Sequence, residues 1–217
     1  VELVGDLNSD LVTNNDNTHL NSHDSPSPTR DDDDNTGDTI YFKGPSHILS
    51  NLYPCTLQLY SHTYCSAEQA YQHKKAMFHI DKTRNEKDKQ ELRKISHDIM
   101  GTEDPYKIMS VAKQIKPNQE WQTTKRYIME EVLQAKAAQC NAYKDYLLLT
   151  ERKSYIEDTA HLTWGRGKPN KPGNNLLGLL HEKIRGEVFV NDITEKAINI
   201  GIKVPDSPPF KGYDTTP

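Results

Sequence analysis

Four polar side chains between residues 66 and 75 have the spacing i, i+3, i+4 and i+7, which places them on one face of a helix. They are Glu68, Tyr71, Gln72 and Lys75. This face would carry a carboxylate, a phenol, an amide and an ammonium, where a helix packed on a core carries aliphatic side chains. A carboxylate in such a set can stabilise positive charge or orient a water molecule. A solvated helix shows the same mixture, so an ordinary surface helix is the alternative.

The helix that carries this face is predicted to begin at Ser66, because Ser66 and Gln69 form a capping-box pattern. It should run to about residue 80, after a turn over residues 61–65. The pattern of apolar residues predicts short strands over 39–42, 56–60 and 155–157, and further helices over 92–100, 105–115, 120–140, 143–149 and 176–187. A loop over 165–175 and one more short element over 189–204 complete the expectation. The expected fold class is α+β, predominantly helical, in a single domain with a few short strands.

Charge divides the chain into an acidic leader and a mildly basic remainder. Residues 1–39 contain ten acidic residues and a single basic one, Arg30, for a net charge of −9, whereas the remainder has 26 basic and 21 acidic residues, or +5. A polar, charged segment of this kind cannot bury enough apolar surface to offset its ordering entropy. We therefore expect a disordered leader over 1–39, a folded domain over 40–187, and a C-terminal extension over 188–217 that is partly frayed.

Several classes of protein are disfavoured by composition. No apolar run approaches the roughly 18 residues that span a bilayer, so no membrane association is expected. The cysteines Cys55, Cys65 and Cys140 are odd in number and lack metal-ligand spacing, which favours a reducing intracellular compartment, cytoplasmic or nuclear. The chain begins at Val1 without a signal sequence, and we interpret it as a fragment or the tail of a longer polypeptide.

Four ordered motifs resemble the NADAR family (NAD- and ADP-ribose-associated, YbiA-like proteins) between about Ile40 and Arg185. Residues 49–53 are similar to the family's F-S-N-F/W stretch, and residues 66–75 to its S-x-E-H-x-Y/F-Q-x-x-K helix. Residues 121–136 are similar to its W-x-x-x-K…M-x-x-x-L-x-A-K helix. Residues 164–185 are similar to its closing W-G-x-G…G-x-N-x-L-G…R segment. One such motif would be weak, but four in order are specific.

Three positions depart from the family pattern. Gln69 stands where the family has His, and Gln can still donate and accept hydrogen bonds. His161 stands where an acidic residue is usual, three positions before Trp164, which removes a carboxylate beside the expected pocket. Leu176 replaces a basic residue and removes a possible phosphate contact.

The resemblance implies hydrolysis of an N-glycosidic bond to a phosphorylated ribose. The substrates implied are ribosylamino-pyrimidine intermediates of riboflavin synthesis and ADP-ribose attached to a nucleobase, including nucleic acid that carries it. Cleavage leaves positive charge on the ribose, so Glu68 is the candidate carboxylate that stabilises it or orients water. The departing base needs a proton, and His161 is the candidate acid because its ordinary pKa lies near neutrality. Glu157 and Asp158 are alternative acids, and an exposed loop position is the plain alternative for His161.

Other residues are candidate ligand contacts. Trp164 between Gly165 and Gly167 suggests an aromatic wall where backbone approaches the ligand, or else a core tryptophan. Lys136 is a phosphate candidate, and the alternative is that its side chain lies along the apolar stripe of its own helix. The remaining candidates are Lys75 and Lys168 for phosphate, Asn51 and Asn175 for ribose hydroxyls, and Ser50, Tyr71 and Gln72 for further polar contacts. The reaction needs no metal or other cofactor, and no metal-ligand spacing or phosphate-binding glycine loop is present in the sequence.

Two other functions stay open at this level. The domain would bind ADP-ribose or a related nucleotide without cleaving it if the missing acid near Trp164 is essential, or it would be a purely structural unit of a larger polyprotein. The sequence does not give the oligomeric state.

The hydrolase hypothesis predicts that the segment at Ser50 and Asn51, the Glu68 helix and Trp164 meet in one concave site.

Overall fold

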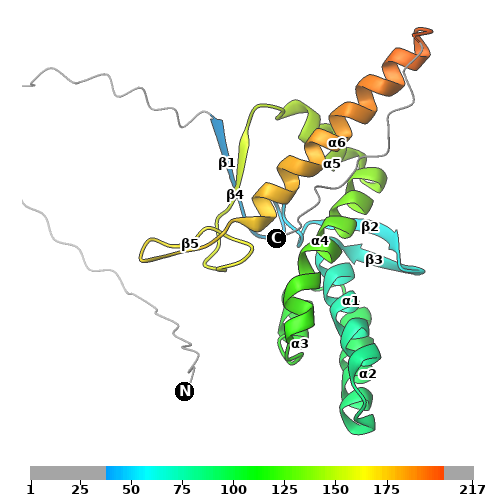
Figure 1. Ribbon diagram of the computed structural model, residues 1–217, viewed down its shortest axis with the longest axis vertical. Helices are drawn as coiled ribbons and strands as arrows, with labels where there is room; N and C mark the ends of the chain where they lie inside the picture. The colour runs from blue at the N-terminus through cyan, green and yellow to red at the C-terminus, as the bar shows by residue number, and fades with distance from the viewer. Residues whose placement is uncertain (1–37, 203–217) are drawn as a thin grey trace, which may run out of the picture. The chain divides into compact units, whose positions relative to one another are not determined.

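The computed structural model describes residues 38–202, and this range is mainly helical (Figure 1). Within it the helices are α1 (Ala67–Lys82), α2 (Glu86–Met100), α3 (Pro105–Ala112), α4 (Gln119–Gln139), α5 (Asn141–Leu149) and α6 (Leu176–Asn199). The strands are β1 (Thr39–Phe42), β2 (Pro54–Leu59), β3 (His62–Ser66), β4 (Ser154–Glu157), β5 (Gly167–Lys168) and β6 (Lys171–Pro172). The predicted α+β, predominantly helical class is confirmed.

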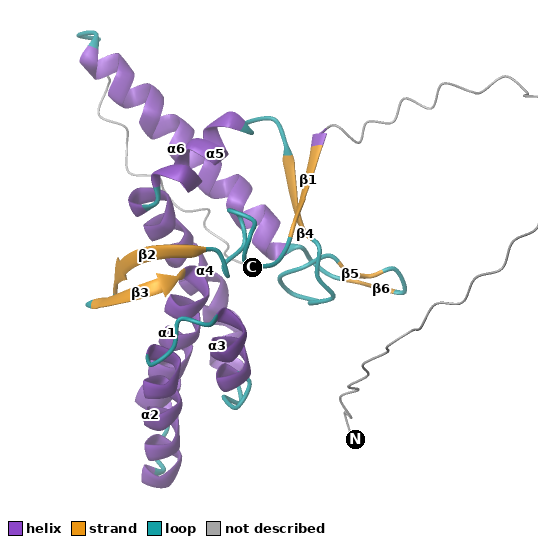
Figure 2. Cartoon of the chain, turned by 180° about the vertical axis from the view of Figure 1, so that it is seen from behind, coloured by secondary structure: helices purple, strands orange, loops and turns teal. Residues whose placement is uncertain are grey.

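The strands form three separate pairs (Figure 2). β1 and β4 are parallel, with Tyr41 opposite Ile156, so the start of the described chain lies beside a segment more than a hundred residues later. β2 and β3 form an antiparallel hairpin that leads into α1, and β5 and β6 form a very short one in the loop before α6. The pairing of β1 with β4 matters most for the site, because it fixes the position of Glu157.

Helix α1 begins as its capping pattern predicts. The Ser66 hydroxyl accepts a hydrogen bond from the backbone N–H of Gln69, and the Gln69 side chain accepts one from the N–H of Cys65 at 2.8 Å. The Gln69 amide also donates to the carbonyls of Ile99 and Thr102. Gln69 therefore joins the start of α1 to the end of α2. The residue that stands here in place of the family's His thus makes structural contacts.

The main core forms where α1, α4, α5 and α6 pack together with the strands. Its largest buried side chains include Trp121, Tyr143 and Tyr155. A second, smaller core joins α1 to α2 and α3 through residues such as Ile99 and Ile108. Burial of these apolar surfaces stabilises the helices, several of which are too short to be stable alone in water.

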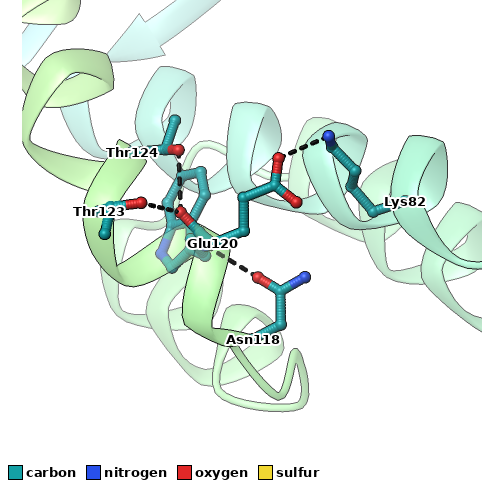
Figure 3. A network of polar contacts seen from close by, with 6 residues as sticks. Lys82, Asn118, Glu120, Thr123 and Thr124 are labelled. Carbon is teal, nitrogen blue, oxygen red and sulfur yellow. Dashed lines mark hydrogen bonds and ion pairs between the residues drawn. The ribbon is translucent and has the colours of Figure 1, made fainter.

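The first turn of α4 is held by the polar contacts drawn in Figure 3. Asn118 caps the helix by accepting a hydrogen bond from the N–H of Trp121 at 2.8 Å. The hydroxyls of Thr123 and Thr124 donate to the carbonyl of Glu120, and the Glu120 carboxylate pairs with Lys82 of α1 at 2.5 Å. These contacts place the end of α1 beside the start of α4.

Two parts of the predicted secondary structure are wrong. Residues 62–66 form strand β3 instead of a turn, because Tyr64 and its neighbours pair with β2. Residues 176–199 form one helix instead of two elements, since helix α6 continues through Gly186. A glycine inside a helix costs only about 1 kcal/mol, which the flanking helical residues can offset.

The predicted leader over 1–39 lies almost wholly outside the described residues, as does the end of the C-terminal extension. The part of that extension that is described, residues 188–202, is mostly the second half of α6. Between residues 38 and 202, no helix combines the length and the hydropathy that crossing a membrane requires.

Candidate functional site

A cavity of about 360 Å³ lies between α1, the segment before β2, the ends of α3 and β4, and the loop before α6. The residues expected to meet there do so, since Ser50, Asn51, Glu68 and Trp164 all line this cavity. The complete lining is Gly44, Ser50, Asn51, Leu52, Glu68, Tyr71, Gln72, Lys75, Met109, Ala112, Lys113, Met129, Glu157, Thr159, His161, Trp164 and Leu177. The predicted polar face of α1 is thus the wall of a cavity and not a solvated surface.

Glu68 is held in the cavity by a second residue of the same helix. The Gln72 amide donates to a Glu68 oxygen at 2.8 Å, and the Lys75 ammonium lies near enough to act on it electrostatically. Burial raises the pKa of Glu68, and the Gln72 hydrogen bond and the Lys75 charge act in the opposite direction. Glu68 is the carboxylate of the site that has groups arranged to stabilise its charge.

Glu157, at the end of β4, is a second carboxylate in the same cavity. Burial, followed by the nearby charge of Glu68, raises the pKa of Glu157 to about 7. Its Oε2 atom is buried and has no hydrogen-bond partner among residues 38–202. A carboxyl group with this pKa is about half protonated at neutral pH and can donate a proton there.

The loop before α6 positions Glu157 through its backbone. The Asn175 side chain accepts a hydrogen bond from the N–H of Glu157 at 2.9 Å and donates to the carbonyl of Tyr155 at 2.8 Å. Gly165 packs directly against the backbone of Glu157 and Thr159, where a Cβ atom would lie 2.7 Å from the Thr159 carbonyl oxygen. This loop therefore holds the end of β4 at a fixed place in the cavity wall.

Gly165, Gly167 and Asn175 do not line the cavity, so the expectation that they contact a ligand is corrected. The close approach that the glycines allow is between segments of the chain itself. Gly167 has a left-handed backbone with a φ of 75°, and a Cβ atom there would lie 2.3 Å from the backbone nitrogen of Gly173. The polar atoms of Asn175 are occupied by β4. These residues support the site from outside it.

Asp158 turns away from the cavity, although it is adjacent to Glu157 in sequence. Its carboxylate pairs with Lys43 at 2.9 Å and with Arg166 at 2.6 Å. The hydrogen bond from Lys43, with the charge of Arg166, holds the pKa of Asp158 below its usual value. Asp158 is therefore ionised near neutral pH and unsuited to act as the acid.

His161 lines the cavity, but its hydrogen bonds are those of a turn-capping residue. Its Nδ1 atom accepts hydrogen bonds from the backbone N–H groups of Thr163 and Trp164, both at 3.1 Å. Desolvation of the ring, with the charge of Lys125, lowers the pKa of His161. The ring is thus neutral near pH 7 and keeps an Nε2–H donor, which disfavours its predicted role as the proton donor.

Trp164 and Tyr71 form an aromatic wall of the cavity. The Tyr71 ring makes an edge-to-face contact with Trp164, with centroids 5.7 Å apart, and contacts Trp121 at 5.6 Å. Because Trp121 is buried and Trp164 is only partly buried, the first belongs to the core and the second faces the cavity. Trp164 thus offers a flat surface on which a ring of a ligand can stack.

Lys136 was expected to contact phosphate, and its position contradicts this. Its side chain is 0% exposed, and its ammonium donates to the carbonyls of Ile48 and Ser50 at 2.7 and 2.9 Å. Burial lowers the pKa of Lys136 to about 8. Lys136 holds the segment that carries Ser50 and Asn51, so it acts on the site through the backbone. Lys168, in β5, also lies outside the cavity lining.

Three lysines around the cavity have no ion-pair partner within the described part of the chain. Lys75 and Lys113 line the cavity, and Lys125 lies close enough to lower the pKa values of both Lys75 and His161. Lys75 makes only a long hydrogen bond, 3.5 Å, to the carbonyl of Ala112. Lys75 is a candidate from the sequence and Lys125 is the lysine of the W-x-x-x-K motif, whereas Lys113 carries no signal beyond its charge. Together the three make an electropositive mouth suited to an anionic ligand.

The cavity also holds buried oxygen atoms without partners. By strict hydrogen-bond geometry, Asn51 Oδ1, Gln72 Oε1, Glu157 Oε2 and Thr159 Oγ1 have no partner among residues 38–202, although the Thr159 hydroxyl lies near enough to Glu157 to oppose the rise of its pKa. The orientation of Gln72 follows from its hydrogen bond to the Glu68 carboxylate, which leaves its oxygen free. Because an unpartnered buried polar atom is costly, these atoms indicate a ligand rich in hydroxyl or amino donors. Among the described residues, no cluster of side chains suited to a metal ion is present.

Comparison with known proteins identifies a family and a similar solved structure. A family model described as NADAR domain matches residues 40–188. The NMR structure of the E. coli protein YbiA is similar with a TM-score of 0.56 at 24% identity, and the similarity covers 72% of this chain and 88% of YbiA. At this identity the likeness to YbiA shows a shared fold. No curated protein matches the chain.

Proposed function

Because the chain belongs to the NADAR family, we propose that it hydrolyses the N-glycosidic bond of a phosphorylated ribosyl or ADP-ribosyl compound. The observation that carries this proposal is the pair Glu68 and Glu157, which come from α1 and β4 and line the same cavity. Two carboxyl groups in different protonation states are what acid-assisted cleavage of a glycosidic bond requires.

The surroundings of the two glutamates divide their roles. Gln72 and Lys75 stabilise the ionised form of Glu68, so Glu68 is the group that faces the positive charge developing on the ribose or orients the attacking water. Within the described residues, Glu157 has only the Thr159 hydroxyl to oppose burial and the charge of Glu68, and with a pKa of about 7 about half of it is protonated at pH 7, so Glu157 is the group that donates a proton to the departing nitrogen. In the balanced reaction the C1′–N bond breaks and the base leaves with the proton from Glu157, while water adds its hydroxyl to C1′ and gives its other proton to Glu68, from which Glu157 is reprotonated through solvent.

Other features of the cavity fit such a substrate. The unpartnered oxygens of Asn51, Gln72 and Thr159 can accept hydrogen bonds from ribose hydroxyls or base amino groups. Trp164 provides a stacking surface worth about 1–3 kcal/mol for a base. Lys75 and Lys113 suit a phosphate at the cavity mouth.

The test is release of free base from ribosylated nucleotides, followed by chromatography. We expect Glu68→Gln to lower kcat by at least about 10²-fold while ligand Kd stays nearly unchanged, because the lost charge acts mainly in the transition state. We expect Glu157→Gln to lower kcat for substrates whose base leaves only when protonated.

Asp158→Asn is the matched control, since it removes a neighbouring carboxylate that points away from the cavity. Its turnover should equal that of the unmodified protein. Tight binding without any release of base would contradict the hydrolase and would indicate a nucleotide-binding module instead. Unchanged turnover of Glu68→Gln would remove Glu68 from the mechanism.

A further inference from the structure

Helix α6 has two apolar sides, of which only one packs on the core. The core side consists of residues spaced by three and four positions, namely Leu177, Leu180, Ile184 and Val188. At the same spacing this side continues with Asp192 and Glu195, which are polar. Beyond Val188, no side chain in the described part of α6 is buried, and this half of the helix continues past the end of α5 (Figure 1). The apolar residues of the second half therefore belong to another face.

This outer face of α6 follows a seven-residue repeat. One set of positions holds Leu179, Gly186, Ile193 and Ile200, and a second set holds Lys183, Val190 and Ala197. The two sets alternate at steps of four and three residues, which is the a/d spacing of a coiled-coil seam. The leucine, the valine and both isoleucines are each at least half exposed. We call these seven residues the α6 seam.

A helix that faces only water does not favour such residues. Solvated helix positions are best filled by strong helix formers such as Ala, Glu and Lys, whereas Val190 and Ile193 are β-branched and form helices less readily. At Gly186 an added Cβ atom would meet nothing within 4 Å, so a neighbouring side chain has room to approach the backbone. The spacing and the composition together indicate that a second helix covers the seam.

The seam is complementary to a second copy of itself when the two helices are antiparallel. If Leu179 lies opposite Ala197 of the second copy, the repeat places Gly186 opposite Val190 and Lys183 opposite Ile193. Two of these layers then pair a larger side chain with a small one, and in the third the aliphatic stem of lysine packs on isoleucine.

Charge also favours the antiparallel pair over a parallel one. The antiparallel alignment brings Glu182 close to Lys196 of the second copy, which has the opposite charge. A parallel pair would place Lys183 beside the same lysine of the second copy, and Glu182 close to Glu187. Like charges at these positions oppose association, and charged residues that flank a seam set the orientation of its helices.

We propose that two copies of this chain associate through their α6 seams, packed antiparallel about a two-fold axis. Each copy contributes the same surface to such an interface. The inference does not depend on the proposed hydrolysis, because among the described residues α6 contributes only Leu177, from its core side, to the cavity that contains Glu68.

The test is the oligomeric state of the full chain, measured by sedimentation equilibrium between about 1 and 100 µM. Val190→Asp and Ile193→Asp each place a charge in the seam. Ile198→Asp is the matched control, because Ile198 lies off the seam in the same helix and is 59% exposed, against 50% for Ile193. All three positions are exposed, so folding should be preserved, as circular dichroism can verify.

We expect the unmodified chain to dimerise within this range, and each seam variant to weaken dimerisation by at least about tenfold, because the dimer would then bury two new charges. Ile198→Asp should dimerise like the unmodified chain. A chain that stays monomeric throughout the range would overturn the proposal and would leave residues 203–217, or another protein, to cover the seam. Equal weakening by Ile198→Asp would overturn it as well.

Ala197→Cys tests the orientation of the two helices. A parallel pair would place residue 197 of both copies side by side, where oxidation with diamide would join them by a disulfide. The antiparallel pair separates them by about 27 Å along the helix axes, at 1.5 Å per residue. We therefore expect no more covalent dimer than the unmodified chain forms through its native cysteines. Efficient cross-linking of this variant would overturn the antiparallel arrangement.

Discussion

Proton affinity at the site depends on how each glutamate is surrounded. Glu68 has an amide donor and an ammonium nearby, whereas Glu157 faces Glu68 and keeps an oxygen without a partner. Burial, followed by the negative charge on Glu68, makes ionisation of Glu157 harder and raises its pKa to about 7. In the proposed mechanism, these two chemically identical side chains take the roles of a base and an acid.

This difference predicts the alkaline limb of the pH–rate profile. In the proposed mechanism Glu157 acts in its protonated form, and its pKa is about 7, so turnover should fall as the pH rises through about 7. Profiles of kcat between pH 5 and 9 test this. Glu157→Gln should abolish the alkaline limb as well as lower the rate, and a limb that persists in that variant would assign the titration to another group.

His161 gives a second prediction at this scale. Its Nδ1 atom accepts two backbone hydrogen bonds, which an aspartate in the same turn can also accept. His161→Asp should therefore leave base release about as fast as before, and His161→Ala should lower the free energy of unfolding by about 1 kcal/mol, as for a lost helix cap. Urea denaturation and the base-release assay measure both. A large gain in turnover for His161→Asp would instead show that the site lacks an acid.

At the level of elements, the sequence predicts what depends on local pattern. The α1 face follows from the spacing of Glu68, Tyr71 and Lys75, and the cap from Ser66 and Gln69. The sequence does not predict features that depend on residues far away in the chain. The position of Glu157 requires the pairing of β1 with β4, and the burial of Lys136 requires the carbonyls of a segment 86 and 88 residues away. Local periodicity carries no information on either.

The glycine-rich loop illustrates the same limit. Gly165 and Asn175 stand beside Trp164 in a motif that suggests ligand contact, yet they contact β4. A glycine that admits a ligand and one that admits a neighbouring strand are the same residue in sequence. The sequence predicts that another group approaches the backbone closely at this loop, but it does not predict that this group is strand β4.

The support given by Asn175 can be measured. Asn175 has a φ of 47°, so Asn175→Gly keeps the left-handed backbone accessible and removes only the side chain. The change leaves the N–H of Glu157 and the carbonyl of Tyr155 without their partner, which should lower the free energy of unfolding by about 1–3 kcal/mol. Turnover should fall as well, because Glu157 loses its anchor. Asn174→Gly, which removes a neighbouring side chain without a hydrogen bond to β4, is the control for both measurements.

For the folded domain as a whole, buried titratable groups make stability depend on pH in two opposite directions. Burial lowers the pKa of His73, which is hydrogen-bonded to Tyr64, to about 4. The unfolded chain then binds more protons below pH 6.5, so this group lowers stability as the pH falls from 6.5 toward 4. Glu157 acts in the other direction. Its raised pKa means that the folded chain binds more protons, so its contribution is present below pH 4.5 and is lost as the pH rises through about 7.

A carboxyl group that suits catalysis near pH 7 therefore lowers stability at the same pH. Glu157→Gln removes the buried charge and should raise the free energy of unfolding by about 1–3 kcal/mol at pH 8, given 1.4 kcal/mol per unit of pKa shift, while it lowers turnover. The gain should shrink as the pH falls and vanish near pH 4.5, where the carboxyl group is neutral in both folded and unfolded chains. Thermal denaturation of both proteins at pH 8 and 4.5 measures this difference. A gain of equal size at the two pH values would mean that Gln packs better than Glu. The charge of Glu157 would then not lower the free energy of unfolding.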